Sequence, residues 1–522
     1  MANEGSYRNL YLAAVVACLT GALFGYSVGF IGGILVLPSF LHHFRLDSLP
    51  PDSLASATSG TVTIWLVGAL IGVPLGMPVC SRWRRRRCLS FCSTLYVLGT
   101  ALQMVNVNGS LRVFDAGRLL NGVGVGAGTL VSPVYISEIS PPSERGMLLS
   151  GYQTAVQLAA LAGFWAAFAA HSILSNSSAL QWQIPVAVQL LPGVLLLLGT
   201  IIISESPKFL AEKGLLLSAE DALSWLRALP KEHPDVLEEV EELREDSQAL
   251  EMLDAPERSF FRELRDRSVR RRLSVGVGLM IAQNMVGLNA LNYYAPTIFM
   301  SAGFTSVSSS LFLTGLFGVI KVLSATSFMF VFVRLRSNRF WLQFGSVVCG
   351  ISMLVLTYCV RRMPAPGRHN PEASKLTADG IVSVLMVYIF AFAFGISLGP
   401  LSWNICSEIF PSHIKAKCCA ITTCVQWLFQ IVVAGVTPHL LASIGWATYL
   451  LYAGCCAVSL VWVLFYVPET KGVPLGRAMD DLFSQLGKAP QAECIEEVDE
   501  TTGLLSRRQR SIGRRDSIGF PV

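Results

Sequence analysis

Charged side chains that interrupt long apolar stretches are the residues of this sequence most able to carry chemistry. They are Arg118, Glu138, Lys321 and Glu408. A charge inside a membrane costs about 2.5–3.5 kcal/mol on insertion scales, so we expect these side chains to face protein or a cavity rather than lipid. The sequence offers no cluster of metal ligands and no nucleophile beside a base. It therefore predicts neither an enzyme nor a bound metal or other cofactor.

These charges must be positioned by apolar stretches that are long enough to cross a membrane. The chain has 522 residues, of which 52% are hydrophobic and 14% are charged. A helix needs about 20 apolar residues to span the hydrocarbon core. Such stretches fall near 9–36, 57–80, 88–107, 113–136, 147–171 and 183–203, and again near 274–300, 308–333, 340–360, 379–403, 417–440 and 444–467. The sequence thus predicts an all-α membrane protein with twelve transmembrane helices.

The remaining charges gather in the loops between these stretches. Basic runs at 81–87 and 334–339 fall in loops that face the cytoplasm if the chain starts there, as the positive-inside rule requires. Loop 361–375 is the exception, because it is basic on the opposite side. Although the formal net charge is +5, no soluble basic face is formed. We therefore expect the lipid bilayer as a partner, and no nucleic acid.

The predicted spans divide into two halves that repeat each other. A basic run follows the second and the eighth span, and a Glu-containing segment follows the fourth and the tenth. Such duplication is typical of carriers that hold a solute between their halves near mid-membrane. We expect a cytoplasmic N-terminus over 1–8, a six-helix half over 9–204, cytoplasmic linker helices over 205–272, a second six-helix half over 273–467, and a disordered cytoplasmic tail over 468–522.

Six segments in order along the chain resemble the sugar porter family of the major facilitator superfamily. They are FGYSVG (24–29), GRLLNGVGVG (117–126), PVYISE through RG (133–146), ESP (205–207), QNMVGLNALNYY (283–294) and PETKG (468–472). The phrases NYYAPTIF (292–299) and GVIK (318–321) are similar to fungal members, which include carriers of hexoses and of hydroxy acids such as quinate or galacturonate. The resemblance implies the major facilitator fold, no cofactor, and function as a monomer.

The resemblance also implies a set of solute-binding side chains. Sugar hydroxyls both donate and accept hydrogen bonds, and amides match them in both roles. The family pattern carries over to Gln153, Gln283, Asn284, Asn289, Trp403, Gln426 and Gln430. Because an unpartnered amide is penalised in an apolar stretch, these side chains need partners, either solute or neighbouring helices.

Gating and locking residues follow from the same resemblance. Tyr293 and Tyr294 resemble an outer gate, with Gly287 and Pro400 as flexible or helix-breaking positions. A latch between the two halves is implied for Glu138 with Arg145 and for Glu408 with Lys415 or Lys417. The alternative is that these charges only cap helix ends.

The coupling position departs from the family pattern. Proton-coupled members carry an Asp where this chain has Ser27, and that Asp pairs with the arginine that corresponds to Arg118. Because serine does not titrate near neutral pH, facilitated diffusion is favoured over proton symport. Asp115 is a candidate substitute acid, or else a helix cap.

The basic loops and one buried lysine also depart from the pattern. Ser81 stands where the family has Asp, and Arg334 and Asn338 stand where the repeat has Asp and Arg, which removes acidic partners from the latch. Lys321 is a candidate selectivity charge: facing the cavity, it would attract a substrate carboxylate, whereas its alternative role is packing or snorkelling.

Together these features predict a secondary transporter that moves a small polyhydroxylated solute by alternating access. A carrier of a hydroxy acid or other small metabolite, and a nutrient sensor that signals through its tail, remain as alternatives. The resemblance implies the plasma membrane, whereas the acidic dileucine pattern at 500–505 is typical of endosomal or vacuolar proteins. Asn108 and Asn176 are candidate glycosylation sites.

Overall fold

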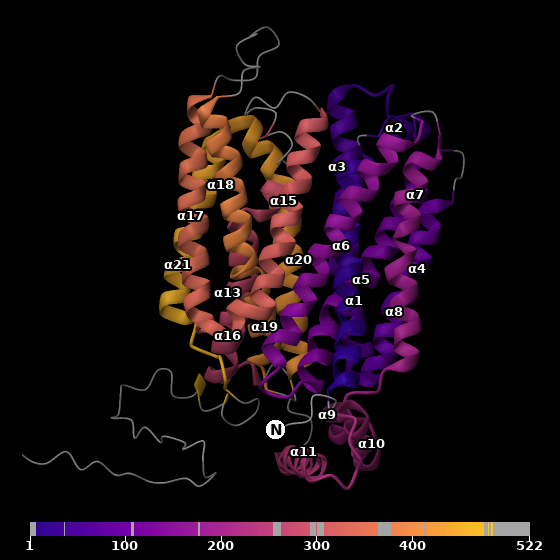
Figure 1. Ribbon diagram of the computed structural model, residues 1–522, viewed down its shortest axis with the longest axis vertical. Helices are drawn as coiled ribbons and strands as arrows, with labels where there is room; N and C mark the ends of the chain where they lie inside the picture. The colour runs from indigo at the N-terminus through magenta and orange to yellow at the C-terminus, as the bar shows by residue number, and fades with distance from the viewer. Residues whose placement is uncertain are drawn as a thin grey trace, which may run out of the picture.

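The fold is an upright bundle of helices in two groups. The computed structural model describes residues 7–473, 479 and 482–483, apart from 36, 106–108, 176–177, 254–262, 293–298, 300–306, 364–376 and 412–413. Within these residues the secondary structure is helical and no strand occurs. Figure 1 shows the indigo-to-magenta helices of the N-terminal half standing beside the orange and yellow helices of the C-terminal half.

The N-terminal half contains the first six spans. Single helices form the first five, and two consecutive helices form the sixth. A short helix, α2 (Pro38–His43), follows the first span. The spans are α1 (Arg8–Ile34), α3 (Pro51–Arg82), α4 (Arg85–Met104), α5 (Leu111–Ile139), α6 (Arg145–Ile173), and α7 (Leu180–Val188) with α8 (Leu190–Ile202).

The C-terminal half repeats this arrangement, and two of its spans are interrupted. The eighth span contains a π-helical turn, η1, and the tenth span is broken into two helices. The spans are α13 (Arg267–Met285), α15 (Val307–Ser327) with η1 (Phe328–Phe332) and α16 (Val333–Leu335), α17 (Asn338–Arg362), α18 (Ala378–Gly395) with α19 (Leu398–Glu408), α20 (Lys415–Ile444), and α21 (Ala447–Tyr466).

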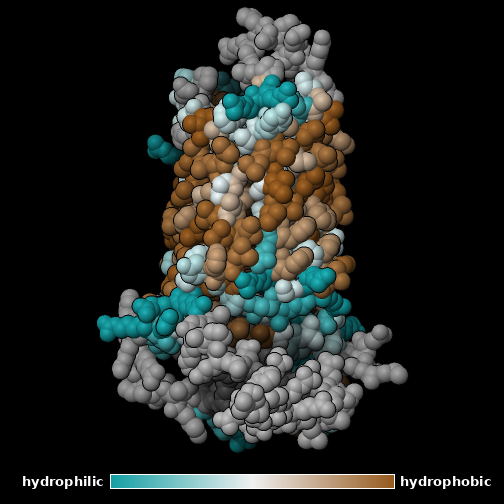
Figure 2. All heavy atoms as spheres, turned by 90° about the vertical axis from the view of Figure 1, so that its left-hand side faces the viewer, coloured by the Kyte–Doolittle hydropathy of each residue, from teal (hydrophilic) through white to brown (hydrophobic). Residues whose placement is uncertain are grey.

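The outer surface of the bundle matches a membrane. Among the described residues, eleven helices are long and apolar enough to cross one. The one span not among these eleven is α4, which starts with the arginines at 85–87 and is 20 residues long, and it packs against α5 and α8 inside the N-terminal half. Figure 2 shows a broad hydrophobic band between hydrophilic rims. On α21 the apolar side chains of Val458 and Phe465 are exposed. The predicted twelve-helix fold is confirmed.

Three helices extend from one end of the bundle, which we call the linker end. They are α9 (Pro207–Glu212), α10 (Leu216–Arg227) and α11 (Pro234–Leu253), as Figure 1 shows. The buried Arg227 ties them to the transmembrane part, because it pairs with Glu239 at 2.9 Å and donates to the Ile139 carbonyl at 3.3 Å. The basic residues around 85 and 334 lie at this end, which is the pattern that the positive-inside rule predicts for a cytoplasmic face.

Glycines allow the helices of the N-terminal half to approach closely. A Cβ on Gly25 of α1 would lie 1.9 Å from the Val156 carbonyl oxygen of α6, and one on Gly126 of α5 would lie 2.0 Å from that of Ala69 in α3. Gly124, on another side of α5, faces α4 at Cys92. Small residues thus serve helix packing, as expected inside membranes.

Candidate functional site

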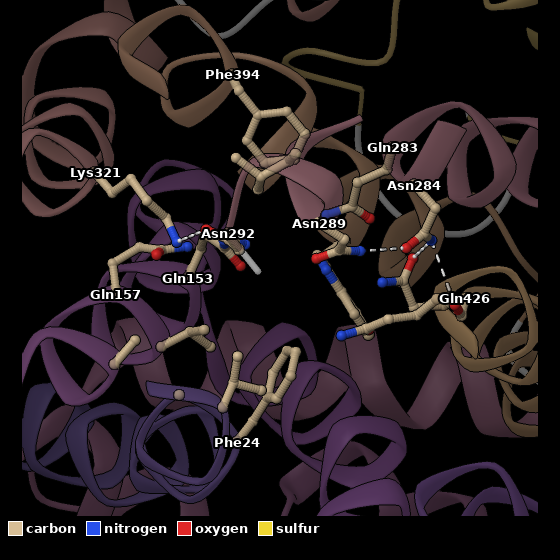
Figure 3. Close-up of a pocket in the computed structure, with 17 residues that line it drawn as sticks. Phe24, Gln153, Gln157, Gln283, Asn284, Asn289, Asn292, Lys321, Phe394 and Gln426 are labelled. Carbon is tan, nitrogen blue, oxygen red and sulfur yellow. Dashed lines mark hydrogen bonds between the residues drawn. The ribbon is translucent and has the colours of Figure 1, made fainter. Parts of the chain in front are cut away.

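A cavity of about 560 Å³ lies between the two halves, at mid-height of the bundle. The N-terminal half lines it with α1 and α6, and the C-terminal half with α13 and the residues after it, α15, α18, α19 and α20. Figure 3 shows the polar side chains of both halves pointing into this space.

The structure brings together all seven side chains that were expected to bind solute. Each of them lines this one cavity, although they come from four spans that are far apart in the sequence. They are Gln153 on α6, Gln283 and Asn284 on α13 with Asn289 shortly after it, Trp403 on α19, and Gln426 and Gln430 on α20.

Amides on one side of the cavity form a connected row. Asn284 donates to the side-chain oxygen of Gln426 at 2.6 Å and to the Met280 carbonyl at 2.9 Å. Asn289 donates to the Asn284 side-chain oxygen at 3.0 Å. These hydrogen bonds fix the orientation of the amides from α13 to α20, so the row is organised without a ligand.

Two acceptors in the same region have no partner within the described residues. They are the buried side-chain oxygens of Gln283 and Gln430. The amide nitrogen of Gln283 is satisfied, since it donates to the Gly399 carbonyl at 3.2 Å. A buried acceptor without a donor costs roughly 1–3 kcal/mol. A ligand with hydroxyl donors would remove that cost.

The opposite side of the cavity carries a charge. The Lys321 ammonium of α15 donates to the Asn292 side-chain oxygen at 3.0 Å and lies 5.4 Å from the centre of the Phe317 ring. Gln153 and Gln157 of α6 lie near it, as Figure 3 shows. Sequence reasoning missed Gln157 and Asn292. Gln157 follows Gln153 by four residues, so helical periodicity would have placed both on one face.

Breaks in two helices lie where flexible positions were expected. Gly287 follows the end of α13 with a φ of +98°, a conformation that favours glycine, and a Cβ there would lie 2.8 Å from the Tyr452 ring. The tenth span breaks between Gly395 and Leu398, so that Pro400 sits in the first turn of α19. Trp403, one turn later, lines both the large cavity and a smaller one of about 240 Å³ toward the linker end.

The expected coupling position is a hydrogen-bonded network without an acid. The Ser27 hydroxyl is 3.1 Å from the Tyr96 hydroxyl and 3.4 Å from the Asn121 side-chain oxygen. Arg118, which is 1% exposed, donates to the Ser27 carbonyl at 3.3 Å and lies 5.3 Å from the Trp65 ring centre. Arg118 and Ser27 are thus neighbours, as the resemblance implied, but through the serine backbone.

Asp115 lies one turn from Arg118 on α5 and is half-buried. Arg118 and Thr61 are its polar neighbours, and its buried oxygen Oδ1 has no hydrogen-bond partner within the described residues. Its position therefore leaves both earlier interpretations open, a substitute acid and a residue that stabilises its own helix.

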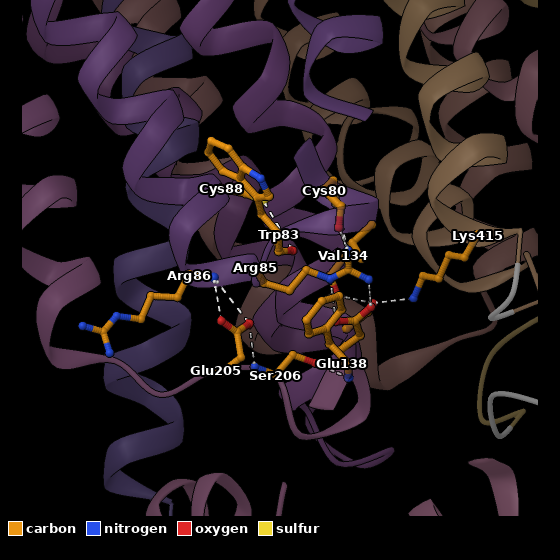
Figure 4. A network of polar contacts seen from close by, with 12 residues as sticks. Cys80, Trp83, Arg85, Arg86, Cys88, Val134, Glu138, Glu205, Ser206 and Lys415 are labelled. Atoms are coloured by element: carbon orange, nitrogen blue, oxygen red, sulfur yellow. Dashed lines mark hydrogen bonds and ion pairs between the residues drawn. The ribbon is translucent and has the colours of Figure 1, made fainter. Parts of the chain in front are cut away.

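The latch residues meet at the linker end, with one pairing that differs from the expected one. Glu138 pairs with Arg85, at 2.9 and 3.1 Å, and not with Arg145, as Figure 4 shows for the first pair. Arg85 is the first residue of α4, and Glu138 lies near the end of α5 in the same half. The Arg85 guanidinium therefore occupies the position beside the Glu138 carboxylate that was expected for Arg145. Lys415 donates to the Ser137 hydroxyl at 2.7 Å, while Arg145 and Glu408 line a common cavity of about 880 Å³.

Hydrogen bonds between the two halves are found beside the cavity and on its linker side. Besides Lys415 and Ser137, Asn404 donates to the Ser150 hydroxyl at 3.0 Å. Trp427 donates to the Thr129 hydroxyl at 3.3 Å, and Arg334 to the Glu144 carboxylate at 3.5 Å. This conformation is therefore closed toward the linker end.

Some expectations fall outside the described residues. The gate tyrosines Tyr293 and Tyr294, the glycosylation candidates Asn108 and Asn176, and the tail beyond 483 all belong there. They remain predictions from the sequence.

Comparisons with known proteins match this geometry along most of the chain. A family model described as "Sugar (and other) transporter" matches residues 13–482. A protein named "Probable quinate permease" from Aspergillus fumigatus is 33% identical over 481 residues, which cover 91% of this chain and 87% of that protein. The "Quinate permease" of Emericella nidulans is 32% identical over 480 residues, covering 91% of this chain and 89% of that protein.

A solved structure has the same fold. The proton:xylose symporter XylE bound to 6-bromo-6-deoxy-D-glucose superposes with a TM-score of 0.77, covering 92% of this chain and 100% of that one. The sequences are 24% identical, so this likeness bears on the fold alone.

Proposed function

Because the chain belongs to the sugar (and other) transporter family within the major facilitator superfamily, we propose that its solute is small and polyhydroxylated and moves by alternating access. The family consists of secondary transporters of small molecules, and the apolar outer surface makes the chain a multi-pass membrane protein.

The amide-lined cavity between the halves carries this proposal. Hydroxyl groups donate and accept, and the cavity offers both amide donors and the two unpartnered oxygens of Gln283 and Gln430. The rings of Phe24 and Trp403 offer flat apolar surfaces for the C–H faces of a ring-shaped solute. Alternating access then consists of breaking the linker-end hydrogen bonds while the other end closes.

The transport is proposed to be facilitative. Ser27 stands at the coupling position, and its partners Tyr96 and Asn121 are hydrogen-bonding groups that stay neutral near pH 7. Solute would therefore move down its own gradient, without a proton. Asp115 is the one nearby acid on α5 that could reverse this expectation.

A hydroxy acid is the second candidate solute, and the names of the relatives favour it. Quinate permeases from two fungi match over nearly the whole chain. Quinate carries several hydroxyls on a ring, so the same amides could bind it. A neutral sugar and a hydroxy acid differ mainly in one negative charge.

We further propose that the chain works as a monomer in the plasma membrane. The cavity and its lining belong entirely to one chain, so no second copy is needed to complete the site. The dileucine pattern at 500–505 makes an endosomal or vacuolar membrane the alternative address.

Uptake in a transporter-deficient host tests the function. Labelled glucose, fructose, xylose, galacturonate and quinate are supplied with and without an imposed proton gradient. We expect saturable uptake of at least one solute, no effect of the gradient, and loss of uptake in Gln153→Ala at unchanged surface expression. Gradient-driven accumulation would exclude facilitated diffusion and direct attention to Asp115→Asn. Absence of any flux from protein at the surface would overturn the transport of these solutes.

A further inference from the structure

Among the described residues, Lys321 stands in the solute cavity as a cation without a neighbouring acid. It is the one charged residue among those that line the cavity within the described part of the chain. The helices α1, α6, α13, α15 and α20, which supply most of the lining, contain no Asp or Glu in their sequences. On α18 and α19, the other two contributors, the acids are Asp379 and Glu408, at the far ends of the broken span.

The position of Lys321 excludes an escape to the membrane surface. It follows Phe312 by nine residues and precedes Leu335 by fourteen in a span of 24 residues. At 1.5 Å per residue it lies about 14 Å from one end and about 21 Å from the other. A lysine side chain is shorter than either distance, so snorkelling does not hydrate the charge.

The contacts of Lys321 do not neutralise it. An ammonium has three donors. The side-chain oxygen of Asn292, at 3.0 Å, accepts one, and the Phe317 ring at 5.4 Å adds a weak attraction. Neither contact supplies negative charge, so a partly buried cation faces the cavity.

We infer that Lys321, with Asn292 and Gln157 beside it, is a subsite for the carboxylate of a hydroxylated acid. The amide row of Asn284, Asn289 and Gln426 lies on the opposite side of the same cavity, as Figure 3 shows. A solute bound between them presents its carboxylate to α15 and its hydroxyls to α13 and α20. This inference rests on the proposed function, and it selects the acid over the neutral sugar as the solute.

Exchange of the lysine tests the subsite with a matched pair of solutes. Galacturonate has a carboxylate where galactose has a hydroxymethyl group, and quinate is included as a second acidic solute. Uptake of all three is measured for the full chain, for Lys321→Met and for Lys321→Arg. Lys213→Met, which removes an exposed lysine after α9, is the control for loss of a positive charge.

We expect the wild type to prefer at least one acid over galactose by about tenfold or more in KM, since charge-assisted hydrogen bonds are roughly twice as strong as neutral ones. Lys321→Met should abolish that preference by raising KM for the acid, and Lys321→Arg should keep part of it. Equal KM values for acid and galactose in the wild type, or an unchanged preference in Lys321→Met, would overturn the subsite and leave transport intact.

Two further outcomes are also decisive. A wild-type protein that reaches the surface and moves none of the solutes overturns the proposed function, and the subsite with it. If Lys321→Met fails to reach the surface, Lys321→Gln replaces it, and the wild-type preference for acid over galactose decides independently of any variant.

Discussion

The two halves of the molecule build their linker ends from corresponding parts, but they use them differently. In the N-terminal half, Glu205 accepts from the backbone N–H of Arg86 at the start of α4, as Figure 4 shows. In the C-terminal half, Glu469 accepts from the backbone N–H groups of Asn338 and Arg339 at the start of α17, at 3.0 and 3.1 Å. Each half thus uses a loop glutamate to satisfy the first donors of its third helix.

The difference lies in the first residue of that helix. Arg85 opens α4 and holds Glu138 in a two-pronged ion pair, whereas Asn338 opens α17 and donates to the Thr470 hydroxyl at 3.1 Å. Glu408, the counterpart of Glu138, therefore has no arginine at this position of its own half, and shares a cavity with Arg145 of the other half. One acid is committed within its half, and the other is left for contact between the halves.

Breaking the Arg85–Glu138 ion pair should have the largest effect on stability. Arg85 and Glu138 are 7% and 4% exposed, so Arg85→Ala leaves a buried carboxylate without its partner, which costs about 3–5 kcal/mol. Asn338→Ala, the matched change in the other half, removes one neutral hydrogen bond worth about 1 kcal/mol. Unfolding midpoints of the purified proteins, followed by tryptophan fluorescence, measure both. Equal losses in the two variants would remove the distinction between the halves.

Restoring an arginine in the C-terminal half should have a smaller and different effect. In Asn338→Arg, the new guanidinium lies in the cavity that also contains Glu408 and competes with Arg145 for it. Closure at the linker end should weaken, and the open population should rise by roughly threefold to tenfold, where tenfold is 1.4 kcal/mol. Asn338→Gln is the neutral control.

Native cysteines report this opening. Cys406 and Cys419 are buried and line the small cavity between Trp403 and the linker end. Their labelling by N-ethylmaleimide should accelerate in Asn338→Arg, relative to Cys349, which is buried within the C-terminal half away from that cavity. An unchanged rate would mean that Glu408 does not help to hold the halves together.

The contrast between the halves also marks how far the sequence could lead. Span positions followed from apolar length alone, and the cavity residues Gln153, Gln426 and Gln430 followed from family resemblance, because amides inside apolar helices have few possible roles. The Glu138 partner did not follow. Arg85 is one of four consecutive arginines, 84–87, and which of them faces inward depends on where α4 begins.

The sequence also did not show what the altered residues of the two basic loops would do in each half. The altered basic loops were expected to weaken the latch in both halves, yet Arg85 keeps its pair and the change at Asn338 affects the C-terminal half. Partner choice over 53 residues, from Arg85 to Glu138, is set by tertiary packing. The local sequence pattern therefore does not predict which arginine pairs with Glu138.

Glu205, whose carboxylate accepts from the backbone N–H of Arg86 at the start of α4, should show the smallest effect on stability, and this effect should depend on pH. Burial raises the pKa of Glu205 above its ordinary value, although the N–H groups of Ser206 and Arg86 oppose this. The folded state therefore binds the proton more tightly than the unfolded one, so this residue's contribution to stability falls as the pH rises from about 4.3 through the raised pKa. In Glu205→Gln that dependence disappears, and the difference in unfolding midpoint between wild type and variant should change across this range. Glu469→Gln leaves Glu205 in place, so it should retain the wild-type slope attributable to Glu205. A wild-type midpoint that rises relative to Glu205→Gln with increasing pH would show that the backbone donors of Glu205 outweigh its burial.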